Sequence, residues 1–206
     1  HERLHDDAIH RGVRDTGGRV TLAIYECKKP VIGAINGAAV GIGATMTLAM
    51  DIRLASEKAR IWFVFGKIGV VPEACSSWFL PRIVGIQQAL EWVYTGDILT
   101  AEQALTGKLV RSVHAPEDLM PAAYELARKF SQNKSPVAVA FARQMLYRNS
   151  AQPHPIEAHR IDSLAMFYTS LEDGKEGVSS FLEKRDPAYA SKASAMPAFY
   201  PWWNKA

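Results

Sequence analysis

The chain has 206 residues, of which 48% are apolar and 22% charged, the proportions of an ordinary globular protein that can bury a core. Its formal net charge of +3 is too small to indicate a nucleic-acid-binding protein, and its two cysteines, without metal-ligand spacing, indicate neither a disulfide scaffold nor a zinc site. Glycines and Asn36 interrupt its longest apolar stretch and its start is highly charged, so we expect no membrane span, no secretory signal and a cytoplasmic location, or an organelle matrix in a eukaryote.

Residues 28–51, KKPVIGAINGAAVGIGATMTLAMD, carry the most informative pattern in the chain. The apolar run at 31–35 predicts a strand that is covered on both faces. A glycine-rich turn follows, and an apolar helix is expected over 44–50. The glycines of the turn are Gly37, Gly41 and Gly43. Strand, turn and helix in this order leave backbone N–H groups free at the start of the helix, where they can hold a negative charge.

The segments around this pattern are short and predict alternating strands and helices. Residues 1–17 predict a short helix or loop, and residues 20–26 fit a helix or a strand. Further strands are expected at 51–55, 58–65 and 109–114. Helices are expected at about 74–84, with a kink or break at Pro81, at 86–94, and after Thr100, which forms a capping box with Gln103. The pattern predicts repeated ββα units.

Beyond Pro116 the sequence changes to long helical segments. The expected helices are 118–133, 136–148, 154–170 and 175–185. The tail after these helices is rich in proline and aromatic residues, and we expect it to be extended and packed. The sequence therefore predicts a core domain over 1–115 and a helical oligomerisation region over 116–206.

Four stretches resemble the crotonase family of enoyl-CoA hydratases and isomerases. They are KPVIGAINGAAVGIGATMTLAMDIRLASEKARI, VPEACSSWFLPRIVG, YTGDILTAEQALTGKLV and EGVSSFLEKR, spread over residues 27–185. The resemblance implies an α/β fold, the ClpP-like spiral of ββα units, with C-terminal helices that build a homotrimer or a hexamer. It also implies an acyl-CoA thioester substrate, with coenzyme A as part of the substrate, and neither a cofactor nor a metal.

The resemblance also implies site residues. The N–H group of Ile42 matches one of two donors that hold the thioester oxygen in the family. The other donor belongs to a family segment that precedes the equivalent of residues 20–30, and we expect that this segment was either lost from a shortened chain or lies outside this sequence. Phe181 and Lys184 match a C-terminal stretch that approaches coenzyme A, often from a neighbouring subunit, and an ordinary solvated helix face fits them equally well.

The same resemblance bears on the reaction. Family hydratases use two glutamates, and Thr45 and Phe65 occupy the matching positions, where neither can move a proton at neutral pH. Glu73 lies in a stretch that resembles the PEGCSS motif of the isomerase type, with Ala74 in place of the glycine. A single carboxylate suits isomerisation, because it can take a proton from C2 of a 3-enoyl thioester and return it to C4.

Four aromatic side chains are expected to form an apolar wall of the acyl pocket that keeps water from the reacting atoms. They are Trp62, Phe65, Trp78 and Phe79. Aromatic residues at such positions more often belong to the core, so we expect only one or two of them to touch substrate.

Simpler readings of single residues stay open at this point. Glu73 also fits an acid that stabilises the start of a helix, and the glycines fit any tight turn. Cys75 lacks a neighbouring base and is expected to be small and buried, Asp51 is expected to tether a turn or strand end, and the histidines are expected at the surface or at interfaces. An isomerase with Glu73 as its base is the leading hypothesis. A hydratase or other crotonase-type lyase or hydrolase, and a non-catalytic acyl-CoA-binding trimer, are the alternatives.

Overall fold

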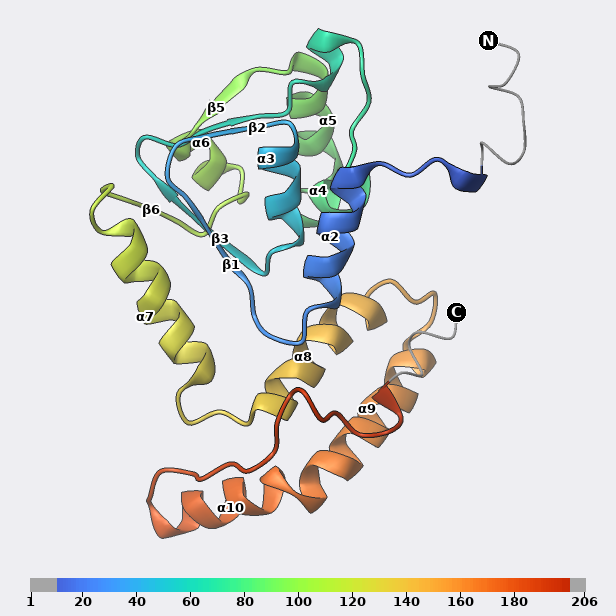
Figure 1. The fold of residues 1–206 in the computed structure, drawn as a ribbon, viewed down its shortest axis with the longest axis vertical. Coiled ribbons are helices and arrows are strands. Elements are labelled where there is room, and N and C mark those ends of the chain that lie inside the picture. Colours follow the sequence, from blue (N-terminus) through green and yellow to red (C-terminus); the bar gives the residue numbers. More distant parts are fainter. Residues whose placement is uncertain (1–10, 201–206) are drawn as a thin grey trace. The chain divides into compact units, whose positions relative to one another are not determined.

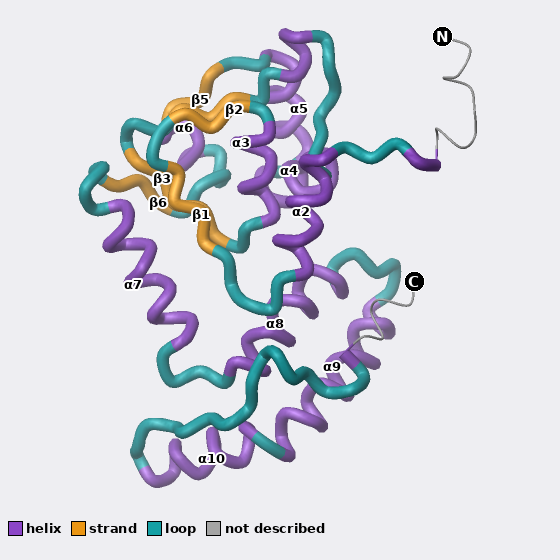
Figure 2. Tube along the Cα trace, in the orientation of Figure 1, coloured by secondary structure: helices purple, strands orange, loops and turns teal. Residues whose placement is uncertain are grey.

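The computed structural model describes residues 11–200, which divide into two compact units (Figures 1 and 2). The first unit runs to residue 25 and resumes from 31 to 123, and the second comprises residues 26–30 and those from 124 onward. The expectations for residues 1–10 and 201–206 fall outside the described residues. Within residues 11–200, no helix has the length and apolar character needed to cross a membrane.

Two small sheets organise the first unit (orange in Figure 2). The strands described in it are β1 (Ile32–Ile35), β2 (Ala38–Val40), β3 (Ile52–Ser56), β4 (Arg60–Trp62), β5 (Ile98–Thr100) and β6 (Ser112–His114). One sheet has the order β1-β3-β6 with parallel neighbours, and the other has the order β2-β4-β5, in which only the β4–β5 pair is antiparallel. The successive strands β1 and β2 lie in different sheets, and so do β3 and β4. This arrangement confirms the predicted spiral of ββα units.

The helices of the first unit connect and cover these strands (Figure 1). They are α2 (Thr16–Glu26), α3 (Ile42–Thr45), η2 (Met46–Ala49), η3 (Phe65–Ile68), α4 (Ser76–Val84), α5 (Ile86–Thr95) and α6 (Ala101–Thr106). The predicted capping box is present, because the Thr100 side chain accepts the N–H of Gln103 and the Gln103 side chain accepts the N–H of Thr100. Helix α4 continues through Pro81, so the proline does not end it.

Several predicted elements differ from the observed ones. The glycine-rich stretch contains strand β2, and the helix expected over 44–50 consists of the short α3 followed by the 3₁₀ helix η2. The strand expected over 58–65 stops at Trp62, and β5 was not predicted. Strands of three residues are too short to show an alternating pattern, so pairing with neighbours rather than sequence periodicity defines them.

Two polar side chains fix the ends of the strands. Asp51 Oδ2 accepts the backbone N–H of Val31 at 2.7 Å, which confirms the predicted tether. Arg53 is only 8% exposed, and its guanidinium donates to the carbonyl oxygens of Leu109 at 2.7 Å and Met50 at 2.6 Å. A buried cation is stable there because backbone carbonyls replace the water it loses.

The second unit is helical. Helix α7 (Leu119–Ser131) leads into it, and α8 (Pro136–Asn149), α9 (Pro155–Leu171) and α10 (Asp173–Glu183) follow, all within a few residues of the predicted bounds. The tail returns over these helices as expected, with the Phe199 ring stacked on Phe141 at 5.3 Å between centroids. The core of this unit includes Val137, Phe141, Ala165 and Tyr200.

Candidate active site

Glu73 lies in the loop before α4, and its local backbone is unusual. The next two residues, Ala74 and Cys75, both have positive φ angles, of 53° and 57°. Residues other than glycine rarely adopt this conformation, which costs of order 1–3 kcal/mol for each residue and often marks a functional site. Helix α4 therefore begins at Ser76 rather than near residue 74, and the half-buried Glu73 stands outside its first turn. This position weakens the reading of Glu73 as a simple helix-start acid.

The Glu73 carboxylate is instead held by α3. Thr45 is fully buried, and its hydroxyl donates to Oε1 of Glu73 at 2.5 Å. The same hydroxyl lies 3.2 Å from the carbonyl oxygen of Gly41. A hydroxyl has one proton to donate, so the shorter contact, to the charged acceptor, is the stronger of the two. Two residues that are 28 positions apart thus meet at one site.

The first turn of α2 closes the other side of the carboxylate. A Cβ atom at Gly17 would overlap Oε2 of Glu73 and would stand 2.6 Å from Cδ1 of Ile42. Asp15, just before the helix, accepts the N–H of Gly18 and, at 3.3 Å, the N–H of Ala74. Asp15 therefore caps α2 and ties this helix to the strained loop that carries Glu73.

Sequence reasoning missed Asp15 and Gly17. The available signal was an acid placed three residues before Gly18, which is the spacing of an N-terminal helix cap. The close approach of Gly17 to Glu73 had no signal in the sequence, because it depends on tertiary packing.

The glycine turn presents free backbone donors next to Thr45. Gly41 has a φ of 52°, so it is the glycine of the predicted three whose conformation requires that residue type. Its carbonyl accepts the N–H groups of Ala44 and Thr45, both at 2.9 Å. Within the described residues, the N–H groups of Ile42 and Gly43 have no acceptor, as expected at the start of a helix. A free N–H in this place suits the predicted role of Ile42 as an oxyanion donor, and Ile42 is 44% exposed.

The four predicted pocket aromatics occupy different surroundings. Phe65 and Phe79 are buried in the core, and Trp62 donates its indole N–H to the carbonyl of Gly96 at 2.5 Å. Trp78 packs edge-on against Phe79 at 4.6 Å, and both rings contact Tyr25 of α2. The contact of these four residues with an acyl chain stays a prediction.

Cys75 was predicted to be buried, and it is half-buried. Burial raises the pKa of its thiol, and the negative charges of Asp15 and Glu73 raise it further. A thiol with a raised pKa is mostly protonated at neutral pH and is a poor nucleophile. Cys75 therefore belongs to the surroundings of the carboxylates rather than to a nucleophilic centre.

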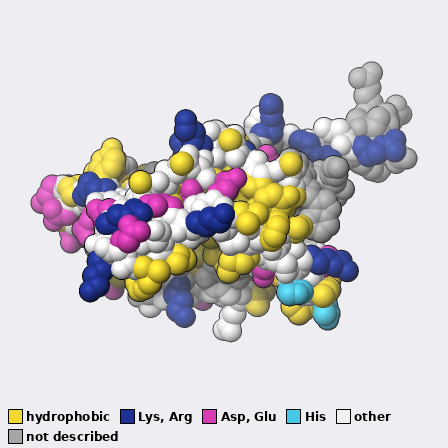
Figure 3. Space-filling view, turned by 90° about the horizontal axis from the view of Figure 1, so that it is seen from below, with side chains coloured by type: hydrophobic (Ala, Val, Ile, Leu, Met, Phe, Trp, Pro, Cys, Tyr) yellow, Lys and Arg dark blue, Asp and Glu magenta, His cyan; other side chains and the backbone are white. Residues whose placement is uncertain are grey.

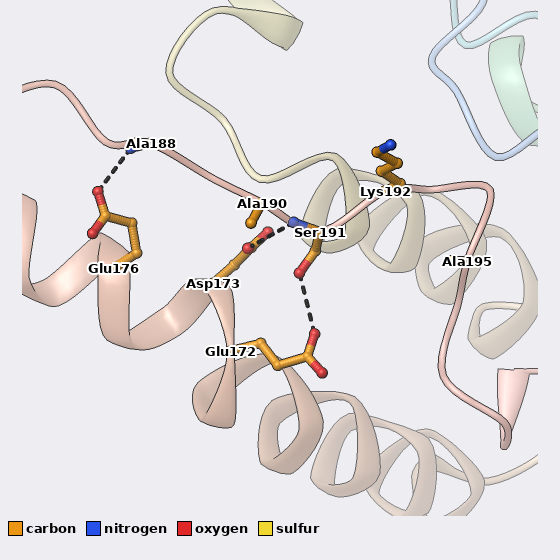
Figure 4. Close-up of a pocket in the computed structure, with 8 residues that line it drawn as sticks. All are labelled: Glu172, Asp173, Glu176, Ala188, Ala190, Ser191, Lys192 and Ala195. Carbon is orange, nitrogen blue, oxygen red and sulfur yellow. Dashed lines mark hydrogen bonds between the residues drawn. The ribbon is translucent and has the colours of Figure 1, made fainter.

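The predicted coenzyme A contacts lie in the second unit. Phe181 is 81% exposed on α10, and Lys184 follows that helix with a φ of 55°. Their role stays a prediction. An open hollow of about 530 Å³ runs between α10 and the tail, and it is lined by residues close to them in the sequence (Figure 4). Its acidic side chains bond to the tail, as when Glu176 accepts the N–H of Ala188 and Asp173 accepts the N–H of Ser191 (Figure 4). Among the described residues, no cluster of His, Cys, Asp and Glu is suited to a metal ion.

Comparison with known proteins gives consistent matches. The family model described as "Enoyl-CoA hydratase/isomerase" matches residues 2–192. The protein described as enoyl-CoA hydratase AFT3-1 of Alternaria alternata is 45% identical over 179 residues, which are 85% of this chain and 60% of that protein. The 1,2-epoxyphenylacetyl-CoA isomerase of Escherichia coli (strain K12) is 35% identical over 80% of this chain and 62% of that protein. The crystal structure of the enoyl-CoA hydratase from Bacillus anthracis has a TM-score of 0.80 and 29% identity, covering 91% of this chain and 73% of that one. The chain thus spans about three fifths of the length of these two curated relatives.

Proposed function

The chain belongs to the enoyl-CoA hydratase/isomerase family, and we propose that the protein acts on an acyl-CoA thioester and moves the double bond of a 3-enoyl-CoA to the 2-enoyl position. The observation that carries this proposal is the single held carboxylate of Glu73 beside the glycine turn. The two positions at which family hydratases have glutamates hold Thr45, which is buried, and Phe65, which is 2% exposed. Asp15, the other carboxylate near this loop, accepts the N–H groups of Gly18 and Ala74.

The proposed reaction uses Glu73 as its base and the N–H of Ile42 as one of the two oxyanion donors that the family resemblance implies. Glu73 takes a proton from C2, and the negative charge of the resulting dienolate develops on the thioester oxygen. The N–H of Ile42 donates to that oxygen, an interaction whose loss typically raises the barrier by about 2.7–4 kcal/mol. Glu73 then returns the proton to C4, which leaves the double bond between C2 and C3. One carboxylate serves both transfers, so no second acid is required.

The direct test supplies a 2-enoyl-CoA and a 3-enoyl-CoA and follows hydration and double-bond migration separately. We expect migration in the wild-type protein, and a loss of roughly 10²–10⁴-fold in Glu73→Gln because the amide cannot accept the proton. Glu57→Gln is the matched control, since Glu57 is exposed and its side chain lies outside the site. Rapid hydration that survives Glu73→Gln would overturn the proposal.

Enoyl-CoA hydration is the second candidate, because the relatives with 44–45% identity are described as enoyl-CoA hydratases. A hydratase must hold a water molecule and exchange protons with it. A hydratase should therefore add water to the 2-enoyl-CoA and cause little double-bond migration in the 3-enoyl-CoA. Binding of both thioesters without turnover of either would instead favour the non-catalytic acyl-CoA-binding alternative.

We also propose that the helical region self-associates, as a homotrimer or as a hexamer. Apolar side chains are exposed along α9 and α10, among them Met166, Phe167, Val178, Phe181 and Leu182. Figure 3, viewed from below, shows such hydrophobic groups at the surface beside charged ones. Met166, Val178 and Leu182 line an open groove of about 630 Å³. Exposed apolar surface of this kind favours association. Sedimentation equilibrium tests it, and a monomer at micromolar concentration would contradict it.

A further inference from the structure

We propose that Thr45 is a positioning residue, which holds Oε1 of Glu73 so that Oε2 is the oxygen that carries the proton. This inference rests on the proposed function, in which Glu73 is the base. It gives Thr45 a role of its own, rather than treating that position as one where a hydratase glutamate is missing.

The contacts of the two carboxylate oxygens differ. Oε1 accepts a hydrogen bond from the Thr45 hydroxyl at 2.5 Å. Within residues 11–200, the Glu73 carboxylate accepts no other hydrogen bond. Oε2 therefore accepts none from this part of the chain, and it lies against the backbone of Gly17 and the end of the Ile42 side chain. An oxygen that already accepts a short hydrogen bond is a weaker acceptor for a substrate proton than an oxygen that accepts none. The asymmetry therefore selects Oε2 for proton transfer.

The place of Thr45 in the chain couples the base to the oxyanion donor. Thr45 ends α3, the helix that begins with Ile42, and its backbone N–H bonds Gly41 at 2.9 Å. Because Thr45 is fully buried, its hydroxyl cannot turn away to water. One short helix thus fixes the donor through its backbone and the base through a side chain.

The proton balance is simple. The C2–H bond breaks, an O–H bond forms at Oε2, and the electron pair delocalises over the dienolate. The Oε2–H bond then breaks as a C4–H bond forms, and nothing is oxidised or reduced. A carboxylate held by one oxygen can deliver the same proton before solvent replaces it. A loose carboxylate can exchange its proton with water between the two steps.

The test compares Thr45→Val, which loses the hydroxyl but keeps the shape, with Thr45→Ser, which keeps the hydroxyl. A 3-enoyl-CoA with deuterium at C2 reports both kcat and the fraction of deuterium found at C4 of the product. We expect Thr45→Val to lower kcat by roughly 10²-fold, the cost of misplacing a catalytic group by about 1 Å, with KM little changed. Deuterium transfer should fall in Thr45→Val and be restored in Thr45→Ser.

Thr47→Val is the matched control. Thr47 is also buried, and its hydroxyl donates to a backbone carbonyl, that of Ala44, at 2.7 Å. Within the described residues its hydroxyl makes no hydrogen bond to Glu73, so its loss should reduce stability without changing the deuterium transfer. An equal loss of transfer in Thr47→Val, or wild-type kcat and transfer in Thr45→Val, would overturn the inference.

The inference can be separated from the proposed function. If the wild-type protein moves no double bond, the proposed function fails, and crystal structures of the variants then decide the positioning role. A Glu73 carboxylate that stays in place in Thr45→Ser and turns away in Thr45→Val supports the role. A carboxylate in the same place in both variants contradicts it.

Discussion

Gly17 and Glu73 approach so closely that a methyl group at residue 17 would overlap Oε2 of the carboxylate. The first turn of α2 and the loop before α4 therefore form one structure around that oxygen. Asp15 strengthens the link, because it bonds both to Gly18 in the helix and to Ala74 in the loop.

We expect Gly17→Ala to reduce activity much more than stability. Alanine favours a helix over glycine by up to about 1 kcal/mol, and this gain opposes an overpacking cost of about 1–3 kcal/mol. The two nearest atoms to the new methyl group are the ends of the Glu73 and Ile42 side chains, which can move only at the expense of the site, and Cβ of Ala74 lies 3.1 Å away. Double-bond migration and urea unfolding measure the two effects. Gly12→Ala is the control, since a Cβ there has open space. Full activity in Gly17→Ala would show that Oε2 need not lie where the structure has it.

Much of the scaffold was predictable because its signals are local. The apolar run at 31–35 forms β1, and Thr100 with Gln103 forms the capping box. The bounds of α8 and α9 follow from Ser135 and His154, whose side chains accept N–H groups at the starts of the two helices, each followed by a proline.

The parts that were not predictable depend on long-range contacts. Strands β2 and β5 exist because each pairs with β4, and neither has a pattern of its own. The motif around Glu73 made it a candidate base. Its partner Thr45 was noticed only because it occupies a position where family hydratases have a glutamate. The hydrogen bond between them requires α3 and the loop before α4, which are distant in sequence, to meet. The left-handed Ala74 and Cys75 likewise have no sequence signal, because residues of these types rarely adopt that conformation.

Asp15→Asn should make Cys75 more reactive. The negative charge of Asp15 contributes, after burial, to the raised pKa of the Cys75 thiol. Asparagine removes the charge and keeps an oxygen that caps α2, so the pKa falls and more thiolate forms at a given pH. Maleimide labelling at pH 8 in a Cys27→Ser background measures the rate, with Glu57→Gln as the control. We expect a several-fold increase in the labelling rate. A rate that is unchanged or slower would contradict the effect of the Asp15 charge on the Cys75 thiol.

Arg53→Met should destabilise the first unit. The side chain is buried and its guanidinium satisfies carbonyl oxygens of Leu109 and Met50, which methionine leaves without a donor. An unsatisfied buried carbonyl costs about 1–3 kcal/mol. Urea unfolding measures the loss, and Arg53→Lys should recover part of it. Arg60→Met is the control, because Arg60 is exposed and donates from there to the carbonyl oxygens of Glu57 and Ala59. Similar losses in the two methionine variants would refute a structural role for Arg53.

Glu176 should hold the tail on α10 down to low pH. The Arg185 guanidinium, followed by the N–H of Ala188, lowers the pKa of Glu176 from 4.5 to about 2. Because the pKa is lower in the folded state, the ionised carboxylate adds full stability above pH 4.5, and this contribution is lost as the pH falls through about 2. Hydrogen exchange at the Ala188 amide, expressed as a protection factor, reports the contact, which is 2.7 Å long. We expect protection to persist at pH 4 and to fall towards pH 2, and to be lower at every pH above 4.5 in Glu176→Gln. Glu183→Gln is the matched control, because Glu183 also pairs with Arg185 and accepts no bond from the tail backbone. Protection of Ala188 that is lost already at pH 4, or is lost equally in both variants, would contradict this role of Glu176.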